Sequence, residues 1–209
     1  MTIELQHVSK SFGKQAVISD FTHTFLPGQC YAVTGPNGSG KSTLLKLIAG
    51  FMLPGEGKVI YNLNNKNIPD NEAFTHIAVA APYLELIEEF SLQEMIRFHF
   101  GFKPLTQTYK ENDLFDLLGY PQFRDKILRD FSSGMKQRVK LLLALLSEVP
   151  VILLDEPCTN LDQDGIDWYI NLTNSSLANR LIIIFSNDKK YEFPFCSSTV
   201  RLSEYGAFS

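Results

Sequence analysis

Residues 35–42 read Gly-Pro-Asn-Gly-Ser-Gly-Lys-Ser, a complete GxxxxGK[ST] pattern. The pattern follows an apolar, strand-like run at residues 30–33 and precedes a helix-like run at residues 43–48, which is the setting of a phosphate-binding loop. Glycines let consecutive main-chain N–H groups point at one anion, and the following helix adds its positive dipole end. The residues that we expect to bind a nucleotide here are Gly35, Asn37, Gly38, Ser39, Gly40, Lys41, Ser42 and Thr43.

Two side chains of this loop, those of Lys41 and Ser42, can bind phosphate and metal directly. The Lys41 ammonium can reach the β- and γ-phosphates of a nucleotide, and the Ser42 hydroxyl can occupy one position around Mg²⁺. The alternative interpretation is a glycine-rich turn that only joins a strand to a helix. The lysine–serine pair and both flanking segments favour ATP and Mg²⁺ as ligands of this loop.

A second pattern places two carboxylates after a buried strand. Residues 151–154 are all apolar, and Asp155 and Glu156 follow directly, at the end of a strand where α/β sheets bind ligands. Adjacent buried carboxylates are unfavourable unless a cation compensates them. We therefore expect Asp155 to bind Mg²⁺ together with Ser42, and Glu156 to act as general base on an attacking water. A solvated acidic turn is the alternative.

Composition limits the class of protein. The chain has 209 residues with 44% hydrophobic content and a net charge of −4, which allows one domain with a sizeable core and gives no basic surplus for nucleic acid. Cys30, Cys158 and Cys196 are three cysteines without paired spacing, so we expect free thiols in a reducing cytoplasm. The sequence has neither a signal-peptide pattern nor the roughly 18 consecutive apolar residues of a membrane helix.

The order of the expected elements predicts an α/β fold. Strand patterns cover parts of residues 3–33, 59–61, 77–80, 151–154 and 181–185, a loop covers 62–71, and helical patterns dominate residues 84–147. Alternating buried strands and helices indicate a mainly parallel sheet covered on both faces. We expect a single domain, 1–209, of the P-loop NTPase class, with an amino-terminal antiparallel β part and a helical subdomain inserted at about 84–147.

A third motif narrows the choice among P-loop proteins. Residues 131–138 read Phe-Ser-Ser-Gly-Met-Lys-Gln-Arg and open a long helix shortly before the strand that ends at Asp155. They resemble the LSGGQ signature of ATP-binding cassette (ABC) proteins. Pro157 after Glu156, the run at 160–162 that is similar to the family's D-loop, and Phe12 fall in the order that the family has. The resemblance covers residues 3–202.

This resemblance implies a partner and further site residues. Two copies would form a head-to-tail homodimer in which Ser132 and Gly134 of one signature contact the ATP of the other copy, while Phe12 stacks on adenine. For Ser132 the alternative is an ordinary helix start. For Phe12 it is a core aromatic, and for Asp162 an acid at a helix amino end.

Two positions depart from the family pattern. After residues 77–80 the family usually has a glutamine that contacts Mg²⁺ and water, but this chain has Ala81, Pro82 and Tyr83, with Glu85 as a substitute in a shifted alignment. After residues 181–185 the usual histidine is replaced by Asn187, which can donate from its amide but carries no charge. We expect slow but real ATP hydrolysis, because Lys41, Ser42, Asp155 and Glu156 are all present. The candidate catalytic residues are Glu156, Lys41 and Asn187.

The resemblance implies the ATP-binding and ATP-hydrolysing subunit of a transporter. Such a subunit is cytoplasmic and lies on the inner face of the cell membrane, bound to a separate transmembrane permease. Two alternatives stay open. One is a regulatory nucleotide-binding module with little hydrolysis, and the other is a soluble ABC ATPase outside transport.

Overall fold

A five-stranded parallel sheet forms the centre of this computed structural model, which describes residues 1–177 and 179–202. The strand order is β6-β7-β8-β3-β9, and every pairing in this sheet is parallel. The strands are β3 (Cys30–Thr34), β6 (Ile77–Ala80), β7 (Val151–Asp155), β8 (Leu181–Ser186) and β9 (Ser198–Arg201). The predicted mainly parallel sheet is confirmed.

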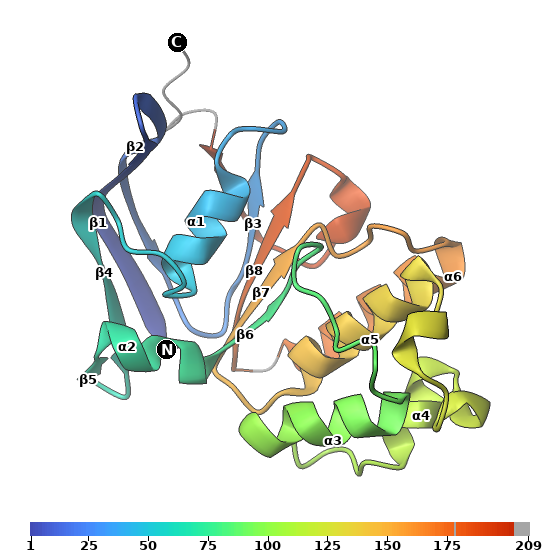
Figure 1. Cartoon of the computed structure of the whole chain (residues 1–209). Helices are drawn as coiled ribbons and strands as arrows, with labels where there is room; N and C mark the ends of the chain where they lie inside the picture. The colour runs from blue at the N-terminus through green and yellow to red at the C-terminus, as the bar shows by residue number, and fades with distance from the viewer. Residues whose placement is uncertain (178, 203–209) are drawn as a thin grey trace.

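Helices cover both faces of this sheet (Figure 1). Helix α1 (Lys41–Ile48) lies on one face, and α5 (Ser133–Leu146) and α6 (Gln163–Ser176) lie on the other. Alternate residues of β7 therefore enter different cores: Leu153 packs with the residues of α1, whereas Ile152 packs with those of α5. A strand buried on both faces has to be apolar throughout, which explains the continuous apolar runs of the sequence.

A second, antiparallel sheet has the strand order β2-β1-β4-β5. Its strands are β1 (Thr2–Phe12), β2 (Gln15–Phe25), β4 (Glu56–Leu63) and β5 (Lys66–Ile68), and α2 (Asp70–Ala73) and the short helix η1 (Phe74–His76) follow. The prediction of a loop over residues 62–71 is thus wrong. Asn64 and Asn65 have φ values of 51° and 62°, as in a two-residue hairpin turn, so this segment pairs with β4 as a hairpin.

The segment between β6 and β7 is helical, as the sequence predicts. Helix α3 (Leu92–Phe102) begins with a capping box between Ser91 and Glu94, and α4 (Asp113–Leu118) ends at Gly119, whose φ is 77°. The short helices η2 (Pro121–Phe123) and η3 (Leu128–Asp130) lead into α5, and η4 (Lys190–Glu192) follows β8. A serine cap and a left-handed glycine are the usual helix boundaries. The limits of the inserted subdomain at about 84–147 stay a prediction.

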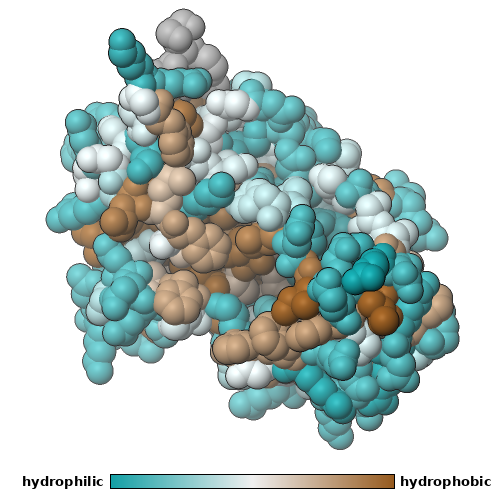
Figure 2. Space-filling model, in the orientation of Figure 1, coloured by the Kyte–Doolittle hydropathy of each residue, from teal (hydrophilic) through white to brown (hydrophobic). Residues whose placement is uncertain are grey.

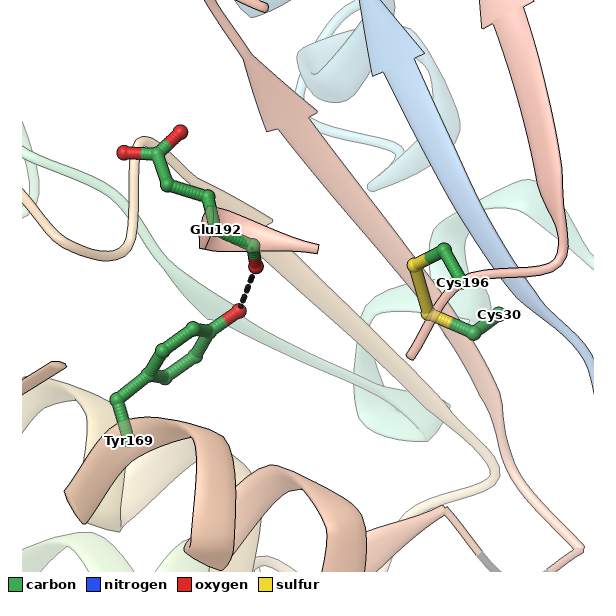
Figure 3. The surroundings of a disulfide bond; sticks show 4 residues. All are labelled: Cys30, Tyr169, Glu192 and Cys196. Carbon is green, nitrogen blue, oxygen red and sulfur yellow. Dashed lines mark hydrogen bonds between the residues drawn. A yellow bond between two sulfur atoms is a disulfide. The ribbon is translucent and has the colours of Figure 1, made fainter. Parts of the chain in front are cut away.

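The expectation of free thiols is wrong for two of the three cysteines. Cys30 and Cys196 form a disulfide across 166 residues of sequence (Figure 3), and Cys158 is buried and free. The cause is the parallel pairing of β3 and β9, in which Tyr31 lies opposite Ser198. This pairing brings the start of β3 beside residue 196, which the spacing of cysteines along the sequence does not reveal.

The helices within the described residues are short. The longest, α5 and α6, have 14 residues each, whereas a membrane span needs about 20. Among the residues that the structure describes, no helix is therefore long and apolar enough to cross a bilayer. Residues 178 and 203–209 of the expected domain 1–209 lie outside the described residues.

One buried histidine makes stability depend on pH. His99 of α3 has Nε2 2.9 Å from Ser147 Oγ, and burial, with a smaller effect of the Lys103 charge, lowers its pKa from 6.5 to about 4. As the pH falls, His99 takes up a proton in the unfolded chain before it does so in the folded chain. The contribution of neutral, buried His99 to stability is therefore complete above about pH 6.5 and is lost as the pH falls toward 4. We expect the free energy of unfolding of wild type relative to His99→Gln to fall over this range.

Urea unfolding of both proteins between pH 4.5 and 8 measures this difference. Its slope cannot exceed about 1.4 kcal/mol per pH unit, the value for one proton. Above pH 7 the difference should be flat, because His99 is neutral in both states, and this range is the control. A difference that stays constant down to pH 4.5 contradicts the prediction.

Candidate functional site

The glycine-rich loop joins the carboxyl end of β3 to the amino end of α1. Gly40, the residue before α1, has a φ of 95°, and a Cβ there would lie 2.8 Å from Ile18 Cδ1. Only glycine fits this position without strain. The N–H groups of the first turn of α1 have no partner within the helix, so they are available to an anion in the hollow that Asn37, Gly38 and residues 40–43 line.

Lys41 is buried beneath this loop. Its Nζ donates to the main-chain carbonyls of Gly35 at 2.7 Å and Pro36 at 2.9 Å. Burial lowers the pKa of Lys41, while the carboxylates of Glu156 and Asp155 oppose the shift. The lysine is therefore held inside the loop by two carbonyl groups, positioned where a phosphate could replace them as partner.

Ser42 and Asp155 meet at the expected metal site. Ser42 Oγ donates to Asp155 Oδ2 at 3.0 Å, across 113 residues of sequence. Burial raises the pKa of Asp155, and the hydrogen bond from Ser42 opposes the shift. Hydroxyl and carboxylate oxygens are the donors that Mg²⁺ prefers, and a cation would compensate the buried charge of Asp155. The residues present thus fit the ion that the sequence predicts.

Glu156 and Asn187 are bonded to each other. The half-buried Glu156 has a left-handed φ of 43°, and its Oε1 accepts from Asn187 Nδ2 at 2.6 Å. Thr159 Oγ1 donates to Glu156 Oε2 at 3.3 Å. Positive φ in a residue other than glycine occurs where the surroundings impose it, often at functional sites. The strand end and these two bonds define the direction of the carboxylate.

These predicted residues share one cavity. A hollow of about 210 Å³ has the loop on one side and Glu156 on the other. Its lining residues are Val17, Asn37, Gly38, Gly40, Lys41, Ser42, Thr43 and Glu156. The structure therefore brings the loop, the lysine and the expected general base around a single space.

Phe12 lies at the end of β1 with half of its surface exposed. The alternative of a core aromatic is therefore wrong for this residue. Lys10 Nζ lies 5.8 Å from the centre of the Phe12 ring. Phe12 does not line the cavity of the loop within this chain, so its contact with adenine stays a prediction.

The signature residues lie at the amino end of α5, and neither Ser132 nor Gly134 lines the cavity. Figure 1 shows this end of α5 apart from α1 and the loop before it. Ser132 is exposed and caps this helix by accepting from Met135 N at 3.2 Å. A Cβ on Gly134 would lie 2.7 Å from the Asn160 carbonyl oxygen. Asp162 caps α6 by accepting from Gly165 N at 2.8 Å, so its alternative as a helix-start acid is confirmed. The structure thus separates Ser132 and Gly134 from the loop of their own chain.

Tyr83 lies where the family has glutamine. Its ring lies under Lys46 of α1, with Nζ 4.7 Å from the ring centre, and burial, with Asp155 nearby, raises its pKa. Glu85 instead lines a separate hollow with Lys140 and His99. The side chain beside Asp155 after β6 is therefore Tyr83, and Glu85 is not brought to the loop.

Sequence reasoning missed Lys46 and Glu192, and it named Tyr83 only as part of the departure from the family pattern. Tyr83 follows a proline and matches no motif, and Lys46 reads as an ordinary polar position of a helix. Glu192 stands between two aromatic residues, and its full burial has no signal in the sequence.

The loop after β3, the buried lysine and the carboxylates after β7 lie along one edge of a parallel sheet. That arrangement defines the class of P-loop NTPases. Within this class, a family model described as ABC transporter matches residues 18–159. Because the match covers more than half of the 209 residues, the chain belongs to the ABC transporter family.

Relatives with known names agree with this assignment. Nod factor export ATP-binding protein I of Rhizobium johnstonii is 31% identical over 165 residues, covering 78% of this chain and 53% of the relative. The sulfate/thiosulfate import ATP-binding protein CysA of Nitrosomonas europaea is 32% identical over 172 residues, covering 78% and 46%. The chain thus spans about half the length of these relatives.

A solved structure of an ATP-binding subunit of an ABC transporter superposes with a TM-score of 0.84 at 27% identity. The alignment covers 96% of this chain and 85% of that structure. The predicted fold class, with its antiparallel part and helical insertion, is confirmed by this likeness together with the strand pairings above.

The contact between Gly134 and Asn160 can be tested by adding one methyl group. Gly134→Ala should destabilise the protein by about 1–3 kcal/mol, because the new Cβ meets a main-chain oxygen. The matched control is Gly101→Ala in α3, where a Cβ has no neighbour within 4 Å and should stabilise by up to about 1 kcal/mol through helix propensity. Thermal unfolding measures both. Equal midpoints for Gly134→Ala and wild type would disprove the close contact.

Proposed function

We propose that the chain is the ATP-binding and ATP-hydrolysing subunit of an ABC transporter. The cavity shared by the loop, Lys41, Ser42 and Glu156 carries this proposal. Loop amides would bind the triphosphate, and Lys41 would exchange its carbonyl partners for β- and γ-phosphate oxygens. Mg²⁺ held by Ser42 and Asp155 would supply charge neutralisation at the phosphates.

Hydrolysis then depends on Glu156. As general base it would orient an attacking water and accept its proton. Asn187 Nδ2, at 2.6 Å from Glu156 Oε1, fixes one carboxylate oxygen and leaves lone pairs on the other for water. An amide supplies this bond without a positive charge, so we expect slower turnover than with a charged histidine at the same place.

The position of the signature supports a dimer. The amino end of α5, which carries Ser132 and Gly134, lies apart from the loop before α1 (Figure 1), and neither residue lines the cavity of the loop. These residues would therefore contact a nucleotide held by a second copy. We propose that ATP closes a head-to-tail homodimer and that hydrolysis opens it. The work comes from the difference in ATP affinity between the open and closed states.

A surface of exposed aromatic residues supports a membrane partner. Phe74, Phe98 and Phe102 have 52%, 44% and 76% of their surface exposed. Figure 2 shows apolar surface over α3 and across to α1 and α2. Exposed apolar patches of this kind mark protein interfaces. We propose that a separate transmembrane permease docks here, which would hold the chain at the cytoplasmic face of the membrane.

A regulatory module with little hydrolysis is the second candidate. The observation that favours it is the absence of both family side chains, glutamine near Pro82 and histidine at Asn187. We do not favour a soluble ABC ATPase outside transport. That function would not explain the exposed aromatic side chains of α3, which a membrane partner would cover.

Phosphate release separates these candidates. With ATP and Mg²⁺, wild type should release phosphate steadily, and Glu156→Gln should lower kcat by about 100-fold or more, because the base is lost. Glu148→Gln, at an exposed acid away from the cavity, is the matched control and should keep the wild-type rate. Equal rates for Glu156→Gln and wild type would remove Glu156 from its role, and no release by wild type favours the regulatory module.

The same variant also tests the homodimer. Glu156→Gln with ATP and Mg²⁺ should elute as a dimer on size exclusion, because the ATP-bound closed dimer opens only after hydrolysis, which this variant performs too slowly. Elution as a monomer at saturating ATP counts against the proposed sandwich.

Docking on the aromatic surface can be tested separately from hydrolysis. Phe98→Ser with Phe102→Ser should reduce the amount of tagged chain recovered with membranes by about fivefold or more, as expected for central apolar contacts. Phosphate release by the isolated chain should not change. Leu26→Ser, at a residue that is 49% exposed in the turn after β2, is the control. Unchanged membrane recovery of the double variant contradicts docking at this surface.

A further inference from the structure

The short helix η4, which follows β8, carries a carboxyl group that the proposed reaction does not use. Glu192, the last residue of η4, is completely buried. Glutamate is almost never fully buried unless it is paired, because removing its charge from water is unfavourable. Burial raises the pKa of Glu192, which favours the protonated carboxyl. A group kept at such a cost calls for a structural or functional reason.

The main chain of Glu192 is fixed from α6. Tyr169, itself fully buried, donates its hydroxyl to the Glu192 carbonyl at 2.7 Å. Figure 3 shows this bond, and it shows the Glu192 carboxyl directed away from Tyr169. The Glu192 N–H also donates to the Lys189 carbonyl at 2.9 Å. The backbone is thus held in one place, and the carboxyl extends from it.

The carboxyl contacts the end of β8. Ser186, the buried last residue of that strand, donates its hydroxyl to Glu192 Oε2. The same hydroxyl oxygen accepts from the Lys189 N–H at 3.2 Å. Glu192 Oε1 lies 3.9 Å from Lys189 Nζ and makes no hydrogen bond of ordinary geometry within the described residues. The Cys158 N–H is close enough to the carboxyl to favour its charged form and oppose the rise in the pKa of Glu192. One carboxyl therefore closes the turn formed by residues 186–189.

This turn carries the amide that bonds the general base. Asn187 directly follows Ser186, and its short side chain reaches Glu156 Oε1 at 2.6 Å. Asp188, the next residue, has a left-handed φ of 60°, a conformation that costs energy outside glycine. An asparagine side chain has only two torsions, so the place of its amide follows the backbone of the turn.

We propose that Glu192 is a positioning residue for ATP hydrolysis: its bond to Ser186 fixes the 186–189 turn and so keeps the Asn187 amide on Glu156. This inference rests on the proposed role of Glu156 as general base. The hydrogen bonds of Lys41 and Ser42 go to Gly35, Pro36 and Asp155, and the charge of Glu192 is the smallest of the four carboxylate effects on the pKa of Lys41. Loss of Glu192 should therefore lower kcat and change ATP binding little.

Two substitutions at residue 192 separate the bond from the packing. Glu192→Gln keeps an acceptor for Ser186 in a neutral side chain, and it should hold kcat within about threefold of wild type. Glu192→Met has similar length and no comparable acceptor, and it should lower kcat about tenfold or more while KM for ATP stays within about twofold. Hydrogen exchange at the Lys189 amide should become faster in the Met variant only.

Ser186→Ala, a smaller change at the other end of the bond, repeats the test if the Met variant does not fold. It should lower kcat at least as much as Glu192→Met does, because it removes the bond to Glu192 and also the acceptor of the Lys189 N–H. The double variant should be no slower than Ser186→Ala alone, because the bond to Glu192 is already lost there. The positioning role would be overturned if Glu192→Met and Ser186→Ala kept the wild-type kcat, or if KM for ATP rose as much as kcat fell. It would also be overturned if the losses of kcat in the two single variants added up in the double variant.

The same kinetics distinguish failure of the proposed function. Equal phosphate release by wild type and Glu156→Gln removes the general base, and the positioning role falls with it. A large effect of Glu156→Gln beside full activity of Glu192→Met rejects only the role of Glu192.

Discussion

The parallel pairing of β7, β8 and β3 is the constraint on which the site depends. Asp155 lies opposite Phe185 and Thr34 lies opposite Ser186, so the three strands end level with one another. The loop after β3, the carboxylates after β7 and the amide after β8 therefore meet at one edge. A slip of one residue in either pairing would reverse the faces of a strand and separate Ser42 from Asp155. Burial of apolar side chains on both faces prevents such a slip.

The features that sequence could predict are those that local chemistry imposes. Gly40 needs a left-handed backbone, residues 151–154 must be apolar to cross between two cores, and Ser91 with Glu94 forms a capping box within four residues. Each requirement involves neighbours along the chain. The P-loop fold and the family follow from such local patterns, and so do the positions of α3, α4 and α5. The hairpin at Asn64 and Asn65 was equally local, and its turn residues could have revealed it.

The features that sequence could not predict depend on contacts between remote segments. The pairing of Cys30 with Cys196 follows from the place of β9 beside β3. The burial of Glu192 follows from Tyr169, 23 residues earlier. Tyr83 approaches Asp155 only because β6 pairs with β7. Spacing along the chain carries no information on these contacts, and a motif search passes over residues that belong to no motif.

The exposed aromatic residues of α3 have a consequence for the lifetime of the subunit in a cell. Phe98 and Phe102 pack against each other with ring centres 5.1 Å apart, yet both remain open to water. Under the proposed docking, a chain synthesised in excess of the permease would carry this apolar area uncovered, and such areas promote self-association and recognition by chaperones. Balanced production of the chain and the proposed permease would then matter for solubility.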